Sequence, residues 1–172
     1  FQQAVMAYQQ GNWGEAEKLC RNLLRGVPDL HQAMGLLGIV KARMNQPTEA
    51  AHWFAKVVEL EPRDAAAQSN LGNALQTLGR LEEALSCYER AIAINPGAAI
   101  AHLNRGAVLQ ALGRNEEALA SYDLSLKLDA ESAKACNNRG NVLFRLGRLE
   151  QALADFDRAI RIDAPLADAY YN

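Results

Sequence analysis

Apolar residues recur at helical spacing along the chain, in pairs of stripes separated by a short break. The clearest pair lies between Ala65 and Ala98. Its first stripe is Ala67, Leu71, Ala74, Leu75 and Leu78, and its second is Leu81, Ala84, Leu85, Tyr88, Ala91 and Ile92. Residues three and four positions apart share one face of an α-helix, so each stripe predicts an amphipathic helix. The pattern therefore predicts two helices joined by a tight turn.

Residues at the ends of these stripes predict where each helix begins and ends. Gly79 follows the first stripe, where a left-handed residue commonly ends a helix. Glu82 and Glu83 fall in the first turn of the second helix, where carboxylates interact favourably with the helix dipole. The dipeptide Asn95-Pro96 stops the second helix, because proline disfavours helical angles in the residue before it.

The same features recur at a fixed interval of 34 residues. The turn glycine is present as Gly11, Gly79, Gly113 and Gly147. A second glycine, within the first helix, recurs as Gly38, Gly72, Gly106 and Gly140, and an aromatic residue of the second helix recurs as Phe54, Tyr88, Tyr122 and Phe156. We expect the second glycine to let the two helices approach closely, with the aromatic ring beside it. A repeat of this length indicates a solenoid of stacked helix pairs.

These repeated positions resemble the sequence pattern of the tetratricopeptide repeat. The residues that carry the resemblance are Leu71-Gly72, Leu75, Ala84, Tyr88, Ala91 and Pro96. The chain is similar to the repeats of O-linked N-acetylglucosamine transferases and of bacterial tetratricopeptide proteins. This implies an all-α fold, a right-handed superhelical solenoid of antiparallel helix pairs. The expected array is continuous, with a partial repeat at 1–30, full repeats at 31–64, 65–98, 99–132 and 133–166, and the start of a further repeat at 167–172.

Five positions depart from the repeat pattern. Lys41 stands in place of a large apolar residue, and Asn45 stands in place of the turn glycine. Cys20 replaces the aromatic residue, whereas Ala130 and Ala164 replace proline. We expect local looseness at these positions within the same fold.

Composition and charge narrow the classes of function. The formal net charge is −2 and the isoelectric point is near 5.9, which argues against nucleic acid as a partner, because phosphate binding needs clustered Lys and Arg. No apolar run approaches the ~18 residues of a membrane span, and no signal peptide opens the chain. We therefore expect no membrane contact and a cytoplasmic location.

Cysteine and histidine positions do not predict a metal, cofactor or catalytic site. The cysteines lack metal-ligand spacing, so we expect them to fill small apolar spaces. They are Cys20, Cys87 and Cys136. The histidines have no partner at i+3 or i+4 that would make a metal or acid–base pair, and we expect them at the surface or in a groove. They are His31, His52 and His102.

The face of each first helix that points away from its partner is expected to line the concave side of the solenoid. In the second copy this face is apolar, with Gly35, Leu36 and Ile39. In later copies it is rich in amides. We predict that the peptide-binding residues are Asn70, Asn73, Gln76, Asn104, Gln110, Lys134, Asn138, Asn141 and Arg145.

Asparagines recur one repeat apart on this face, as Asn70, Asn104, Asn138 and Asn172. Asparagine has a low preference for helix interiors, so an interaction other than helix formation favours it there. The series resembles the asparagine ladder of O-linked N-acetylglucosamine transferases, which implies that amides pair with the backbone of an extended protein substrate. The alternative is that each side chain bonds to a neighbouring helix, or to water between repeats, and so links successive repeats. The sequence leaves both interpretations open.

A second resemblance is to the carboxylate clamp with which some tetratricopeptide co-chaperones hold the acidic C-terminus of a heat-shock chaperone. Asn73, Asn104 and Lys134 match that pattern. Ser69 and Asn138 stand where the clamp requires cations, which argues against this function.

Two arginines, Arg105 and Arg139, replace apolar residues of the pattern. Their stems can pack while the guanidinium groups reach the rim of the groove. A structural ion pair is favoured over binding of an acidic ligand.

These observations predict a non-catalytic protein-interaction scaffold that binds an extended peptide or a partner helix in its concave groove. Two alternatives remain, a substrate-recruiting arm of a larger enzyme such as a glycosyltransferase and a self-associating repeat module. For the latter, the predicted helix Leu149–Ile162 has only the six residues 167–172 of a further helix to cover its apolar face. End-to-end association is therefore expected.

Overall fold

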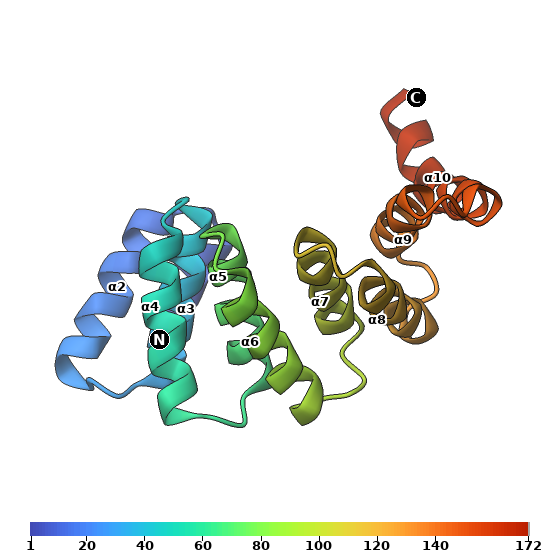
Figure 1. Cartoon of the computed structure of the whole chain (residues 1–172). Coiled ribbons are helices and arrows are strands. Elements are labelled where there is room, and N and C mark those ends of the chain that lie inside the picture. Colours follow the sequence, from blue (N-terminus) through green and yellow to red (C-terminus); the bar gives the residue numbers. More distant parts are fainter. Residues whose placement is uncertain (172) are drawn as a thin grey trace. The chain divides into compact units, whose positions relative to one another are not determined.

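The computed structural model describes the backbone of residues 1–171 and the side chains of residues 1–163. All regular secondary structure within that range is helical (Figure 1), which confirms the all-α fold. The helices are α1 (Gln2–Gln9), α2 (Trp13–Gly26), α3 (His31–Arg43), α4 (Pro47–Leu60), α5 (Ala65–Thr77), α6 (Leu81–Ile94), α7 (Ala99–Ala111), α8 (Asn115–Leu128), α9 (Ala133–Arg145) and α10 (Leu149–Tyr171).

The chain divides into two compact units, an N-terminal unit at Phe1–Ile94 and a C-terminal unit that begins at Asn95. In the N-terminal unit the pairs α1–α2, α3–α4 and α5–α6 pack together, and successive pairs meet through α2–α3 and α4–α5. In the C-terminal unit α7 packs on α8 and α9 packs on α10, with α8 against α9. Each unit is therefore a stack of helix pairs, as the repeat pattern predicts.

A residue with left-handed backbone angles follows the first helix of each pair. The glycines at this position have φ angles of +73° to +77°, and they are Gly11, Gly79, Gly113 and Gly147. Asn45 adopts the same conformation, with φ of +57°, which asparagine tolerates better than most residues. The hydrogen bond from Gln46 N to Lys41 O is 2.9 Å long. Asn45 thus preserves the turn, and the expectation of local looseness at this position is wrong.

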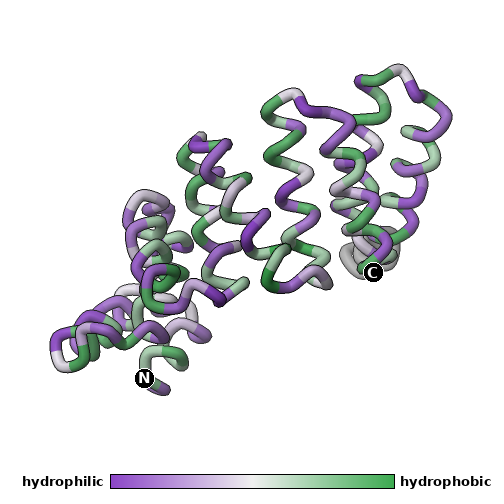
Figure 2. Tube along the Cα trace, turned by 60° about the horizontal axis from the view of Figure 1, so that its bottom comes forward, coloured by the Kyte–Doolittle hydropathy of each residue, from purple (hydrophilic) through white to green (hydrophobic). Residues whose placement is uncertain are grey.

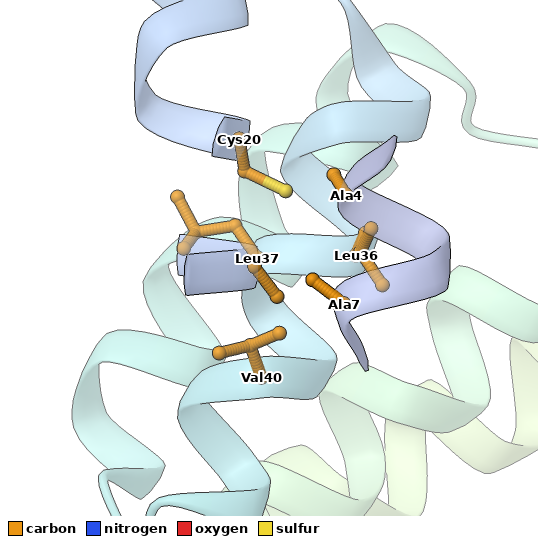
Figure 3. Close-up of a cluster of buried hydrophobic side chains, with 7 residues drawn as sticks. Ala4, Ala7, Cys20, Leu36, Leu37 and Val40 are labelled. Carbon is orange, nitrogen blue, oxygen red and sulfur yellow. The ribbon is translucent and has the colours of Figure 1, made fainter. Parts of the chain in front are cut away.

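One buried apolar cluster of the N-terminal unit lies where α1, α2 and α3 meet, and two others lie among α3, α4 and α5. The side chains that converge in the first cluster include Ala4, Ala7, Cys20, Leu36, Leu37 and Val40 (Figure 3). Cys20 is fully buried, and burial raises the pKa of its thiol to about 11. It therefore takes the place of the usual aromatic ring as a neutral apolar group.

Hydrophobic and hydrophilic stretches alternate along the helices of both units (Figure 2). This is the pattern of helices that bury one face and expose the other. The large side chains with the lowest exposure come from both helices of a pair, among them Leu37, Tyr88, Leu109 and Tyr122.

The glycines within the first helices make room for aromatic rings of the second helices. A Cβ atom added to Gly106 would lie 2.6 Å from Cε1 of Tyr122, closer than real Cβ contacts. The corresponding distances from Gly38, Gly72 and Gly140 to the aromatic rings of their own pairs are 2.6, 2.9 and 2.7 Å. The close approach predicted at this glycine is therefore confirmed, with the ring as the contacting group.

Lys41 does not loosen the fold as expected from the sequence. Its side chain is 5% exposed, and Nζ lies 2.8 Å from Glu17 Oε1 and 3.2 Å from Glu49 Oε2. Nζ also donates to Gln46 Oε1 at 2.9 Å. The buried ammonium group is thereby paired with groups from α2 and α4, which connects both helices to α3.

The last helix differs from the expectation. The sequence predicts a turn after Ile162, but α10 continues to Tyr171. Asp163-Ala164 stands where the third repeat has Asn95-Pro96, and a proline follows one residue later as Pro165. Pro165 disfavours helical angles at Ala164, so the residue pattern still predicts a helix end there and does not explain the longer helix. Asn172 lies outside the described residues, and the repeat boundaries remain predictions.

Candidate functional site

Two adjoining depressions lie on the N-terminal unit, where α3, α4 and α5 meet. Their volumes are about 300 Å³ and about 410 Å³. Ile39, Phe54 and Asn70 line both of them. The two depressions together are called the α3–α5 hollow below.

The lining of the α3–α5 hollow is apolar at its base and polar at its edges. Leu36, Phe54 and Val57 are buried apolar residues of the lining. Gly35, Leu36 and Ile39 lie there as the sequence predicts for an apolar inner face. The polar residues that line it include His31, Arg43, Asp64, Asn70, Asn73 and Thr77.

The charges around the α3–α5 hollow are not equally available. Asp64 caps the start of α5, where its carboxylate accepts hydrogen bonds from Ala66 N at 2.8 Å and Ala67 N at 3.0 Å. His31 Nδ1 lies 3.8 Å from Glu61 Oε1. Arg43 is exposed, and within the described side chains it has no ion-pair partner. The positive charge of Arg43 is therefore available to a ligand.

In the N-terminal unit two of the predicted site residues surround a tyrosine hydroxyl. Tyr88 Oη lies 2.7 Å from Asn73 Oδ1 and 3.1 Å from Gln76 Oε1, so the hydroxyl can donate to either amide oxygen. Burial raises the pKa of Tyr88, so its hydroxyl stays protonated. Asn73 and Gln76 are thus occupied within their own helix pair.

An equivalent arrangement in the C-terminal unit extends from one helix pair to the next. The Tyr122 hydroxyl donates to Gln110 Oε1 at 2.9 Å, and the side-chain amide of Asn138 interacts with the same hydroxyl and lowers its pKa. Burial raises the pKa of Tyr122 to about 12, while the hydrogen bond from Asn138 opposes that rise. Asn138 therefore joins α9 to α8, as in the alternative in which the asparagines link successive repeats.

Asn70 has a different environment. Its side chain is half-buried, lines both depressions, and makes no hydrogen bond to any described residue. Asn104 is also half-buried but has an interaction of its own. The asparagine series is thus not uniform, because Asn138 is committed to a helix contact and Asn70 is not.

The remaining predicted residues lie on α9 of the C-terminal unit. Lys134, Asn141 and Arg145 are all exposed. Asn70, Asn73 and Gln76 belong to the N-terminal unit, whereas Asn104 and Gln110 belong with α9 to the C-terminal unit. The structure thus places the predicted residues on first helices of both units.

Sequence reasoning missed Ala42, Arg43 and Phe54 as residues of the hollow. A pattern in the sequence could have identified the hollow. Both tyrosines of the aromatic position have glutamine twelve residues earlier, as Tyr88 with Gln76 and Tyr122 with Gln110. Phe54 has Ala42 at the corresponding place. Phe54 lacks the hydroxyl of the tyrosines, and Ala42 lacks the amide of the glutamines. Because both missing groups would lie at the same place, their absence predicts a hollow there.

Both arginines that replace apolar residues have structural partners. Arg139 donates to Asp155 through Nε at 2.7 Å and through Nη2 at 2.6 Å, and it also pairs with Asp123 at 2.6 Å. Arg105 Nη1 donates to Ser121 Oγ at 2.8 Å. The expected structural ion pair is confirmed for Arg139.

The expectation that the histidines lie at the surface or in a groove is wrong for His102, which is buried. It is 6% exposed, and its Nε2 lies 3.0 Å from the carbonyl oxygen of Pro96. His52 is exposed and its ring meets Trp53 edge-on.

Among the described residues, no cluster of His, Cys, Asp and Glu could hold a metal ion. Within the same part of the chain, no helix has the length and apolar character needed to cross a membrane.

Solved structures with the same arrangement of helices include MamA, YrrB and PilF. A structure of MamA matches with a TM-score of 0.88 and 22% identity over 96% of each chain. YrrB, described as a TPR protein with an unusual peptide-binding site, matches with a TM-score of 0.79 and 24% identity over 94% of this chain and 83% of its own. PilF of Pseudomonas aeruginosa matches with a TM-score of 0.83 and 21% identity over 98% of this chain and 83% of its own.

The helix pairs and these similarities define an all-α repeat solenoid. Tetratricopeptide-repeat models match residues 65–97 and 133–164, and further TPR models match 87–120 and 111–147. Together they span residues 65–164, more than half of the chain. The chain belongs to the tetratricopeptide-repeat family.

Proposed function

We propose that this chain is a protein-interaction scaffold that binds an extended peptide in the α3–α5 hollow. The observation that carries the proposal is the half-buried amide of Asn70, which lines both depressions without a partner among the described residues. Membership of the tetratricopeptide-repeat family supports a role in protein interaction. The peptide-binding site ascribed to YrrB supports the same class of ligand.

The chemistry of Asn70 favours an extended ligand over a helical one. Its amide offers two donors and one acceptor, which can pair with a peptide C=O and N–H. A helical partner already uses these backbone groups within its own helix, so it would leave Asn70 unpaired. An extended chain has both groups available.

The size of the hollow suits individual side chains of a peptide ligand. Volumes of about 300 and 410 Å³ lie at the low end of the ~300–1,000 Å³ typical of small-molecule pockets. The apolar base formed by Leu36, Ile39 and Phe54 suits an apolar side chain, whose burial contributes about 25 cal/mol per Å². Each depression therefore accommodates a single side chain of an extended peptide.

Binding is tested by selecting end-blocked peptides from a random library against the whole chain and titrating the best binder by calorimetry. The variant Ala66→Trp places a bulky ring at an exposed position that lines the hollow. We expect it to weaken binding by about tenfold or more, because it occupies the space of a ligand side chain. The matched control Glu59→Trp, at an exposed position of α4 outside the hollow, should retain the wild-type affinity. Equal affinity of all three proteins would contradict the proposal.

Self-association is a second candidate function, favoured by one surface of α10. Leu149, Leu153 and Ile160 are 58%, 62% and 66% exposed. Their spacing places them on one side of the helix. Such a stripe is suited to packing against another helix, including one from a second copy of the chain.

A further inference from the structure

We infer that Phe54 and Ala42 convert Asn70 from a structural amide into the ligand-binding amide of this chain, and that the ligand is an extended peptide with an apolar side chain next to an acidic one. This inference rests on the proposed function and specifies its ligand. It concerns the residues that surround Asn70 in the α3–α5 hollow.

The aromatic position of the repeat is a tyrosine at Tyr122 and a phenylalanine at Phe54. Tyr122 in α8 donates to Gln110 in its own pair, and the amide of Asn138 in the next pair interacts with the same hydroxyl. The tyrosine hydroxyl thus holds two amides at once. Asn138 follows Tyr122 by sixteen residues, and Asn70 follows Phe54 by the same interval.

Phe54 differs chemically from Tyr122, which occupies the same repeat position. Phenylalanine has no hydroxyl, so Asn70 has no group at this place with which to form the bond that Asn138 forms. Ala42 replaces the glutamine, and both Ala42 and Phe54 line the hollow. The two substitutions remove a hydroxyl and an amide, and the space that they vacate is bordered by Asn70. A half-buried amide without a protein partner is favoured only if solvent or a ligand pairs with it.

The charge near Asn70 favours an acidic group in the ligand. Arg43 lines the same depression as Asn70 and Phe54, and it has no ion-pair partner among the described side chains. Asp64, which lines the other depression, accepts two capping hydrogen bonds of α5 through its Oδ1. A carboxylate next to the buried apolar side chain of the ligand would therefore meet a complementary charge at Arg43.

The central experiment copies the tyrosine arrangement into the hollow. In the whole chain, Ala42→Gln with Phe54→Tyr supplies the hydroxyl and amide found at Tyr122 and Gln110. End-blocked peptides selected against the wild-type chain serve as the probe. We expect about three- to tenfold weaker binding, because Asn70 becomes paired within the protein. Asn70→Ala should weaken binding by a similar factor.

The coupling between the two changes is the decisive readout. When Asn70→Ala is added to the Ala42→Gln/Phe54→Tyr variant, no further loss is expected, because the amide is already withdrawn from the ligand. Independent losses that multiply would overturn the inference. So would wild-type affinity of the Ala42→Gln/Phe54→Tyr variant when circular dichroism shows that it is folded.

A matched control makes the opposite exchange in the C-terminal unit. Gln110→Ala with Tyr122→Phe removes the hydroxyl that holds Asn138. We expect a lower melting temperature and peptide affinity within about twofold of wild type, since the α3–α5 hollow is untouched. A loss of affinity as large as that caused by Ala42→Gln/Phe54→Tyr would overturn the assignment of the ligand to Asn70.

The charge of the ligand is tested with the same peptides. Replacing the acidic residue of the peptide by its amide should weaken binding to wild type by about threefold or more, and should have no effect on Arg43→Gln. An acidic preference that persists in Arg43→Gln would overturn this part of the inference.

The Ala66→Trp variant distinguishes failure of the inference from failure of the proposed function. If Ala66→Trp abolishes binding while Ala42→Gln/Phe54→Tyr does not, peptides bind in the hollow but Asn70 is not their determinant. If Ala66→Trp also binds normally, the hollow is not the peptide site and both proposals fall.

Discussion

A glycine and an aromatic ring form the closest recurrent contact between the two helices of a pair. The Cβ that Gly106 lacks would lie 2.6 Å from the Tyr122 ring. Gly35, by contrast, lies in the same kind of helix with no heavy atom within 4 Å of its missing Cβ. Both glycines lie within helices, so alanine changes the helix propensity at both positions in the same way. A difference between the two substitutions therefore reports the effect of packing.

Alanine at these two positions should have opposite effects on stability. Gly106→Ala is expected to lower the free energy of unfolding of the C-terminal unit by about 1–3 kcal/mol, because the ring must move from its rotamer. Gly35→Ala is expected to raise the stability of the N-terminal unit by about 0.5–1 kcal/mol, because alanine favours the helix. Urea unfolding followed by circular dichroism measures both. Two changes of the same sign would show that the ring contact at Gly106 is not limiting.

At the residue scale, the sequence was sufficient for positions whose role depends on backbone geometry. The left-handed turn at Gly79 and the close approach at Gly106 follow from the absence of a Cβ, which the sequence states directly. The burial of His102 could not be predicted in this way, since it depends on an interaction with the carbonyl of Pro96. Exposure of polar groups depends on neighbours that one sequence does not specify.

Among the elements, α3 has the most unusual inward contact. The ammonium group of Lys41 occupies the place of a large apolar residue and pairs with Glu17 of α2 and Glu49 of α4. The hydrogen bond from Lys41 is the largest cause of the lowered pKa of Glu17. The sequence showed only that a cation stands at an apolar position. It did not identify Glu17 and Glu49 as partners, because they lie 24 residues before Lys41 and eight residues after it.

Substitutions of Lys41 separate the contribution of side-chain volume from that of charge. Lys41→Leu restores the apolar residue of the other repeats and is expected to change stability by less than about 1 kcal/mol, since apolar replacement of buried ion pairs is often neutral. Lys41→Ala leaves a cavity and should cost about 2 kcal/mol or more. Thermal and urea unfolding measure both. An equal loss in the two variants would mean that the ion pair itself is the main source of stability.

The acid dependence of these variants has a defined sign. The folded-state pKa of Glu17 lies below its ordinary value of 4.5, so ionised Glu17 stabilises the fold above that pH. The stabilisation is lost as the pH falls through the lowered folded-state pKa. We therefore expect wild type to lose more stability than Lys41→Leu as the pH falls below 4.5. Parallel acid-unfolding curves would contradict this role of Glu17.

At the scale of the whole molecule, the helix-pair repeat could be predicted from the sequence, whereas the end of the last helix could not. Periodicity of apolar residues and the glycine series fix the order of helices, because both features are local. The helix α10 continues through Pro165 to Tyr171, although a proline at this place predicts that the helix ends before it. The local residue pattern therefore does not determine this helix end.

The exposed stripe on α10 predicts concentration-dependent association of the chain. Leu153→Glu with Ile160→Glu places charges on two exposed positions of that stripe and should shift sedimentation toward monomer. The control Leu124→Glu alters an apolar residue of α8 that is 45% exposed and should leave the association unchanged. A wild-type chain that sediments as a monomer at all concentrations would contradict the prediction.

The candidate site shows why a repeat position alone does not predict function. The sequence identified Asn70 and Asn138 as equivalent, but Tyr122 occupies the amide of Asn138, whereas Phe54 has no hydroxyl for Asn70. The difference depends on a residue in the preceding helix pair. The apolar inner face at Leu36 and Ile39 was predictable, because it follows from the residue types on one helix face.

Side-chain amide signals of asparagine in nuclear magnetic resonance test the central claim most directly. With the chain labelled with nitrogen-15 and the selected peptide added to saturation, we expect the Asn70 amide signals to shift, because the amide gains a partner. The Asn138 signals should stay in place, since that amide remains bonded to Tyr122. Unchanged Asn70 signals with a saturating bound peptide would contradict binding in the α3–α5 hollow.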